Sequence, residues 1–145
     1  MSRFHVHIAV DDLDRNIRFY SAVFGSEPGV RKTDYAKWAL TEPAINFAIS
    51  ARGRRASLDH VGIQADDAGE LAVIRERLEA AGIAGLAQEA TTCCYAKSDK
   101  YWVQDPQGIA WETFHTLGDA PLFGAVAADV TAGACCAPAL SSRCC

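Results

Sequence analysis

Two histidines and one glutamate in this chain have side chains of the types that bind a divalent metal. His5 and His60 open the similar stretches HVHIAVDD (5–12) and HVGIQADD (60–67), and Glu112 stands in the apolar segment IAWETF. A buried carboxylate is costly unless it is paired or bound to a metal. Two imidazoles and a carboxylate form a facial triad with open coordination positions, a set suited to non-haem Fe(II). Ni, Co, Mn or Zn can use similar ligands, and a Glu112 that faces water at a strand edge is the alternative.

Cysteine supplies the second kind of chemistry. The 6 cysteines form three adjacent pairs, which are Cys93 with Cys94, Cys135 with Cys136, and Cys144 with Cys145. Paired thiols in a reducing compartment indicate metal or catalytic use more than a disulfide framework. The alternative for Cys93 and Cys94 is two small apolar residues in a buried strand.

His7 shares a strand face with His5, because side chains two apart on a strand point the same way. The repeat places Gly62 at the position that matches His7. We therefore keep His5 as the predicted ligand and His7 as its neighbour in the cavity. His115 has the opposite strand parity to Glu112 and is expected to point away.

The repeated stretches predict two similar modules. Each begins as a strand with alternating apolar residues and continues with apolar residues at helical spacing. In the first helix Asp12 is placed to cap the start and Gly25 to end it. In the second, Asp67 and Glu70 have capping-box spacing, and the predicted buried face consists of Leu71, Ile74, Leu78 and Ala81.

Short strand-like runs follow each helix. They lie near 29–33, at 35–40 and 45–50 in module one, and near 86–90, 93–97, 100–104 and 110–115 in module two. The predicted class is α+β, with two βαβββ modules, module one at 1–52 and module two at 57–116, in one domain at 1–117. Residues 118–145 are rich in Ala, Gly and Ser and are predicted to be a flexible, cysteine-containing tail.

Composition excludes several classes of partner. The net charge is −4 and the short basic run RGRR (52–55) is expected to be a solvated loop, so neither nucleic acid nor a membrane surface is favoured. The sequence has no run of signal-peptide or membrane-spanning type, and we expect a cytoplasmic protein, either a monomer or a homodimer.

The two βαβββ modules with His5, His60 and Glu112 resemble the vicinal oxygen chelate superfamily, which includes glyoxalases, extradiol dioxygenases and bleomycin resistance proteins. Within it, TTCCYAKSDKYWV, DHVGIQ, DPQGIAWE and the cysteine-paired tail resemble the carbon-arsenic lyases, some of which are named cadmium-induced proteins. The resemblance covers about residues 1–116. It departs at position 5, where the lyases commonly have Gln and this chain has His.

The resemblance implies Fe(II)- and O2-dependent cleavage of the carbon-arsenic bond of small trivalent organoarsenicals, such as methylarsonous acid, to give arsenite. It also implies that His5, His60 and Glu112 hold the metal and that Cys93 and Cys94 bind the arsenic. Tyr95 and His7 are candidate pocket residues, and the tail cysteines are candidate accessory thiols. One arsenic can contact both thiols only if the strand is irregular there, so we expect a movable loop or bulge at 92–98.

Two other functions stay open. One is a different enzyme of the same fold, such as an extradiol dioxygenase or a glyoxalase-like isomerase, in which the cysteine pair is incidental. The other is a thiol-based protein that binds cadmium or arsenic without turnover, because soft ions prefer thiolates. Asn46 in INFAIS offers no carboxylate as the fourth ligand that glyoxalase-type sites use, which favours an open metal site.

Overall fold

The computed structural model describes residues 1–124. Its elements are β1 (Arg3–Ala9), α1 (Leu13–Phe24), β2 (Val30–Arg31), β3 (Tyr35–Leu40), β4 (Ile45–Ser50), β5 (Ser57–Gln64), α2 (Ala68–Ala80), β6 (Leu86–Cys93), β7 (Ala96–Gln104) and β8 (Ala110–Asp119). Each half has a strand, a helix and three further strands, so the predicted α+β class and the repeated βαβββ order are confirmed.

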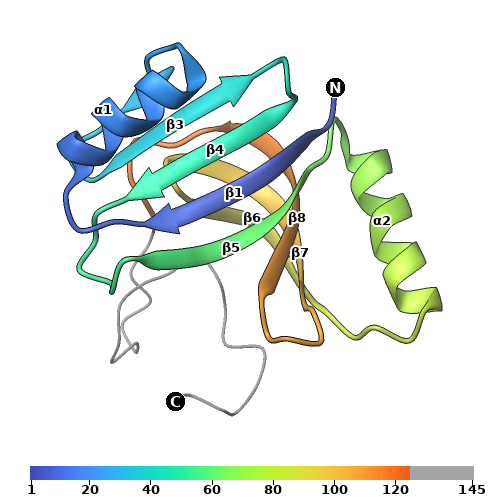
Figure 1. The fold of residues 1–145 in the computed structure, drawn as a ribbon. Coiled ribbons are helices and arrows are strands. Elements are labelled where there is room, and N and C mark those ends of the chain that lie inside the picture. The colour runs from blue at the N-terminus through green and yellow to red at the C-terminus, as the bar shows by residue number, and fades with distance from the viewer. Residues whose placement is uncertain (125–145) are drawn as a thin grey trace.

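All strands belong to one sheet in the order β2-β3-β4-β1-β5-β8-β7-β6. The sheet curls into a half-barrel, with the strands of one module facing those of the other across its interior (Figure 1). The two modules join through their first strands, because β1 and β5 pair antiparallel at the centre. Repeat-equivalent residues therefore come together, and the register sets His5 opposite Gly62 and His7 opposite His60.

Helix α1 forms where the sequence predicts it. The Asp12 side chain accepts a hydrogen bond from the Arg15 backbone N–H, and Gly25 ends the helix with a φ of 65°, a left-handed conformation that glycine adopts at little cost. The helix packs on an apolar core against one face of the sheet. Its buried members are Val10, Leu13, Ile17, Ala36, Trp38, Phe47 and Ile49.

This core accounts for the alternation in β1. Val6 and Ile8 pack against it, while His5 and His7 are buried on the opposite face of the strand. Because successive strand side chains point to opposite faces, the apolar alternation of β1 also fixes the direction of its histidines. They point into the concave side of the half-barrel.

Helix α2 differs from its prediction in how deeply it is buried. Asp67 caps it by accepting from the Glu70 backbone N–H, as the spacing indicated. Leu71, Ile74 and Leu78 are only half-buried, however, and Ala81 is exposed and forms the C-cap. The helix contacts the margin of the sheet at β7 and β8. Among the described residues, no helix has the length and apolar character needed to cross a membrane.

Two predicted boundaries in module two are wrong. Residues 93–97 do not form a separate strand, because β6 continues to Cys93 and β7 begins at Ala96. The predicted tail begins too early, since β8 extends to Asp119 and Phe123 is 9% exposed. Gly124 also forms a β-bridge with Cys93. The cysteine pairs at 135–136 and 144–145 lie outside the described residues.

Candidate functional site

The concave side of the half-barrel is lined with buried polar side chains. They are His5, His7, Asn46, Ser50, His60, Ser98, Lys100 and Glu112, each at most 7% exposed. Buried polar groups are costly unless other groups satisfy them. Their concentration on one face, opposite the apolar core under α1, makes this face the candidate functional site.

The three predicted metal ligands meet on this face. The distances are 3.1 Å from His5 Nε2 to His60 Nε2, 3.5 Å from His5 Nε2 to Glu112 Oε2, and 3.3 Å from His60 Nε2 to the same oxygen. Donor atoms at right angles around one ion, each about 2.1 Å from it, lie about 3 Å apart. The donor set and its spacing therefore fit a divalent metal.

Gly62 makes this meeting possible. It lies between His5 on β1 and Glu112 on β8, and it pairs directly with both residues. A side chain at this position would stand between them, and a Cβ built on Gly62 would lie 1.7 Å from the Glu112 carbonyl oxygen. The repeat has His in one module and Gly in the other because only one of the two matching positions has room for a side chain.

Hydrogen bonds to their other nitrogens orient the two histidines. His60 Nδ1 lies 2.7 Å from Asp59 Oδ1, and His5 Nδ1 lies 3.1 Å from the Asn46 carbonyl oxygen. Such partners fix the ring orientation of metal-binding histidines and leave the opposite nitrogen for the metal. Asn46 Oδ1 is also buried, and within residues 1–124 it has no hydrogen-bond partner.

The surroundings of His5 and His60 shift their pKa values in opposite directions. Burial lowers the pKa of His5 to about 4, against the opposing charge of Glu112. Burial also disfavours the charged form of His60, but its hydrogen bonds to Asp59 and Glu112 outweigh burial and raise its pKa to about 9. In the metal-free protein at neutral pH, His60 therefore carries a proton and His5 does not.

Glu112 is fully ionised despite its burial. Burial alone would raise its pKa, but Lys100, His60 and His5 hold that pKa well below the usual range. Lys100 Nζ donates a hydrogen bond to Glu112 Oε1, the oxygen that does not face the histidines. The sequence analysis missed Lys100, which looked like part of the polar surface run KSDK. The sequence held one clue: Lys100 lies two residues before Trp102, so both side chains point to the same face of β7. Both are buried in the structure.

Cys93 and Cys94 occupy the tip of the β6–β7 hairpin. Cys94 and Tyr95 form the turn, with φ of 56° and 61°. The predicted irregular backbone is therefore present but confined to these two residues, because 92–93 and 96–98 lie in β6 and β7. Cys94 is a free cysteine, whereas Cys93 is disulfide-bonded. The two sulfur atoms lie 3.2 Å apart, which is longer than a disulfide bond of about 2.05 Å, so they are not bonded to each other. A single atom could contact both once Cys93 is reduced. The mobility predicted for this segment stays a prediction.

His7 lies between the thiol pair and the histidine-glutamate cluster. Its Nδ1 is 3.8 Å from Cys94 Sγ, and its ring centroid is 5.0 Å from that of His60. Its Nε2 is hydrogen-bonded to Ser50 Oγ at 2.8 Å. Burial, together with the nearby charge of His60, lowers the His7 pKa to about 3, so the ring is neutral.

His7 also belongs to a second possible donor set. Nitrogen atoms of His5, His7 and His60 all lie within 4.8 Å of one another. The set with Glu112 is tighter and carries the negative charge that a cation needs. Both nitrogens of His7 already have neighbours, in Ser50 and Cys94. We therefore keep His7 as a neighbour of the candidate metal ligands, and this assignment stays a prediction.

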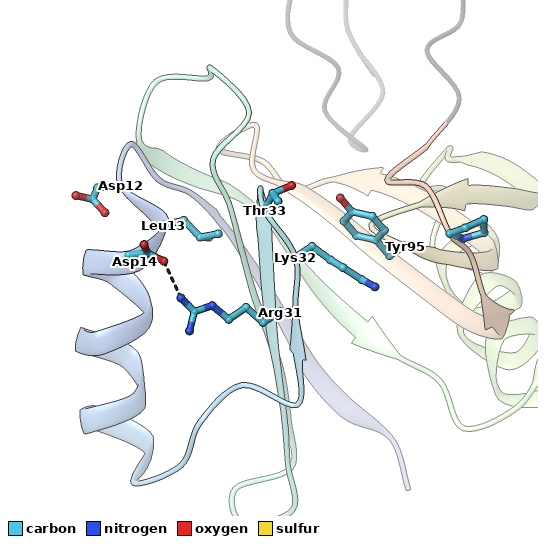
Figure 2. Close-up of a pocket in the computed structure, with 8 residues that line it drawn as sticks. Asp12, Leu13, Asp14, Arg31, Lys32, Thr33 and Tyr95 are labelled. Carbon is cyan, nitrogen blue, oxygen red and sulfur yellow. Dashed lines mark hydrogen bonds and ion pairs between the residues drawn. The ribbon is translucent and has the colours of Figure 1, made fainter.

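Tyr95 attaches the hairpin tip to module one. Its hydroxyl donates to Asp34 Oδ1 at 2.5 Å, and its ring lies 5.7 Å from that of Tyr35 on β3. The side chain also borders an open hollow of about 790 Å³ that runs from Tyr95 to the start of α1. Figure 2 shows Lys32 and Tyr95 side by side in this hollow, and Arg31 paired with Asp14. The hollow borders the tip of the β6–β7 hairpin at Tyr95, but His5, His60 and Glu112 do not line it.

The family of the chain follows from its sequence relatives. The profile of the Glyoxalase/Bleomycin resistance protein/Dioxygenase superfamily matches residues 3–113, and the chain belongs to this superfamily. It is 42% identical over 115 residues to the "Trivalent organoarsenical cleaving enzyme" of Bacillus sp. (strain MD1), covering 77% of this chain and 71% of the relative. A protein of the same name from Thermomonospora curvata is 36% identical, over 95% of this chain and 90% of the relative.

Another relative is named for its induction by cadmium. "Cadmium-induced protein CadI" of Mycobacterium tuberculosis is 36% identical, over 86% of this chain and 82% of the relative. Among solved structures, homoprotocatechuate 2,3-dioxygenase from Arthrobacter globiformis superposes with a TM-score of 0.60 at 17% identity, over 82% of this chain and 37% of that chain. This likeness confirms the half-barrel fold of the superfamily.

Proposed function

We propose that this protein is an Fe(II)- and O2-dependent enzyme that cleaves the carbon-arsenic bond of trivalent organoarsenicals such as methylarsonous acid. One observation carries the proposal. The sulfur atoms of Cys93 and Cys94 lie on the same interior as the two-histidine, one-carboxylate cluster, and they form a thiol pair once the disulfide of Cys93 is reduced. His7 lies 3.8 Å from Cys94 Sγ and beside the His60 ring. The names of relatives at 36–42% identity support the same substrate class.

The thiol pair suits the valence of the substrate. A trivalent arsenic with one carbon substituent has two exchangeable positions, so two thiolates occupy both of them without displacing the carbon. The Sγ atoms of Cys93 and Cys94 are already 3.2 Å apart, so little rearrangement is needed for both to bind one arsenic. In their reduced form the two cysteines hold the substrate, and Tyr95 lies beside its organic group.

His5, His60 and Glu112 are the residues that would hold the metal. Ferrous iron in such a site supplies a centre that binds and activates oxygen. Asp59 orients the His60 ring, and Lys100 offsets the charge of Glu112. The neutral ring of His7 holds Cys94 toward the cluster. Burial of His5, His7, His60, Lys100 and Glu112 limits the access of bulk water to the metal side of the site.

Arsenic speciation provides the test. The reduced protein is loaded anaerobically with Fe(II), incubated with a methylated trivalent arsenical, and then exposed to oxygen while arsenite is measured. We expect arsenite from the unaltered protein only after oxygen is admitted. Replacing Cys93 and Cys94 with Ser, or His60 with Ala, abolishes the release. His115→Ala is the matched control, because His115 is a half-buried histidine on β8 outside the site, and it leaves the rate unchanged.

The same assay separates the competing functions. Arsenite released at the same rate without oxygen would contradict the oxygen-dependent scheme. Arsenical that binds to the unaltered protein and to His60→Ala equally, with no arsenite from either, indicates a thiol-based binding protein. Turnover of a catechol or a hemithioacetal that survives serine at positions 93 and 94 indicates another enzyme of the superfamily.

A further inference from the structure

Lys100 is a buried cation beside the candidate metal site. It is 7% exposed, and its ammonium group lies 5.6 Å from the centroid of the Trp102 ring. Lysine is almost never buried at this level without a partner. Its partner here is Glu112, which accepts a hydrogen bond from Lys100 Nζ at Oε1.

The two oxygens of Glu112 therefore have different neighbours. Oε2 faces His60 Nε2 at 3.3 Å and His5 Nε2 at 3.5 Å, whereas Oε1 is held by the ammonium group of Lys100. A carboxylate can bind a cation through one oxygen or through both. Binding through both would require Oε1 to leave Lys100, whose ammonium would then remain buried without its counter-ion, a costly arrangement.

We propose that Lys100 is a positioning residue that restricts Glu112 to one-oxygen coordination and so keeps an additional coordination position open. This inference rests on the proposed function, because it requires a metal at His5, His60 and Glu112. With one oxygen from Glu112, the chain supplies three of the six positions of an octahedral ion. With two oxygens it supplies four, and one fewer position remains for small ligands.

A role of Lys100 in charge balance alone predicts something different. In that case a neutral residue at position 100 would lower the stability of the metal-free protein but would leave the coordination number of the bound metal unchanged. The number of water molecules on the metal distinguishes the two roles, and it is measured without turnover.

The test counts metal-bound water in the Mn(II)-loaded protein by electron-nuclear double resonance in ¹⁷O-labelled water. We expect Lys100→Met to have one water fewer than the unaltered protein, and Lys100→Arg, which retains a cationic donor, to have the same number. Lys97→Met is the matched control, because Lys97 is an exposed lysine on the same strand, and it leaves the number unchanged.

Three results overturn the proposal. The first is an unchanged number of metal-bound waters in Lys100→Met, and the second is an equal loss of water in the Met and Arg variants. The third is a number of waters in the unaltered protein that matches coordination by both oxygens of Glu112. The last of these applies even if the Met variant does not fold. A Mn(II) titration precedes the count. Failure of the unaltered protein to bind Mn(II), or binding that survives His60→Ala, contradicts the metal site of the proposed function. Normal binding with an unchanged water number contradicts only the role of Lys100.

Discussion

The pKa values of three histidines on one surface differ because their neighbours differ. Burial is the largest influence on His5 and His7, and it lowers their pKa values to about 4 and about 3. His60 is equally buried, yet its hydrogen bonds to Asp59 and Glu112 raise its pKa to about 9. Asp59 is the one of these two partners that lies behind the ring, at Nδ1, where a carboxylate strengthens a histidine as a metal ligand.

Asp59→Asn is expected to weaken metal binding about 10–100-fold, the usual cost of losing a carboxylate behind a metal-binding histidine. Asn keeps the shape and one acceptor, so the change removes charge more than structure. The measurement is a titration with Mn(II) or Fe(II) under anaerobic conditions. Asp14→Asn is the control, since Asp14 forms an exposed ion pair with Arg31 far from the site. Equal affinity in both variants would show that Asp59 does not tune the site.

The sequence alone could identify the residues that recur in its repeat. His5 and His60 are matched by position, and Glu112 is conspicuous among apolar residues. Lys100 could not be found in this way, because it ends the polar run KSDK, which suggests a solvated surface. Asp59 could not be found either, because Phe4 stands at the matching position of the repeat. Their roles depend on strand register, which brings Lys100 beside Phe114 on β8 and so next to Glu112. Register depends on the whole sheet and not on the local run.

At the scale of elements, the site depends on how closely three strands approach. Gly62 on β5 pairs with His5 on β1 and with Glu112 on β8. The absence of a side chain on Gly62 allows β5 and the Glu112 backbone on β8 to approach closely. Strand β5 therefore carries one candidate ligand, His60, and also the residue that lets the strand of Glu112 come near.

Gly62→Ala is expected to destabilise the fold by about 3 kcal/mol or more, at the upper end of overpacking costs, because its Cβ would overlap the Glu112 backbone. Urea denaturation measures the free energy of unfolding. Gly29→Ala is the matched control, since a Cβ at Gly29 meets nothing within 4 Å. A loss of less than about 1 kcal/mol would mean that β5 and β8 can separate without penalty, and that Gly62 does not set their spacing.

The β6–β7 hairpin shows why the sequence predicted a strand at 93–97 where the structure has a turn. Two-residue hairpin turns with positive φ usually contain Asn or Gly, whereas this turn is made by Cys94 and Tyr95. The left-handed conformation costs roughly 1–2 kcal/mol for such residues. The hydrogen bond from Tyr95 to Asp34 and its ring contacts offset part of that cost. Strain of this kind is commonly found at functional sites, and Cys94 lies in this turn directly after Cys93.

On the scale of the whole molecule, stability and chemistry use opposite faces of one sheet. The apolar core between α1 and β1, β3 and β4 stabilises the fold, and the concave face carries the buried polar residues. Pairing of the first strands of the two modules places repeat-equivalent residues together at the centre. The internal repeat therefore brings His5 and His60 to the same place, whereas Gly62 and Glu112 have no like residue at the matching positions of module one.

The concave face also predicts how the stability of the metal-free protein depends on pH. Below about pH 6.5 the unfolded chain protonates its histidines, whereas folded His5 and His7 resist protonation down to about pH 4 and 3. The free energy of unfolding therefore falls as the solution is acidified. His60 acts in the opposite sense, because its folded pKa is about 9. Its contribution is complete below pH 6.5 and is lost as the pH rises toward 9.

We therefore expect maximal stability of the metal-free protein near pH 6.5, with a loss on the order of 3 kcal/mol on the alkaline side. The measurement is urea denaturation with a metal chelator at pH 4.5, 6.5 and 9. His60→Gln keeps the acidic loss and removes the alkaline one, because only His60 among these three histidines has a raised pKa. Stability that is constant or rises from pH 6.5 to 9 would contradict the pairing of protonated His60 with Asp59 and Glu112. That pairing is the arrangement by which the folded chain holds its candidate ligands together before a metal replaces the proton.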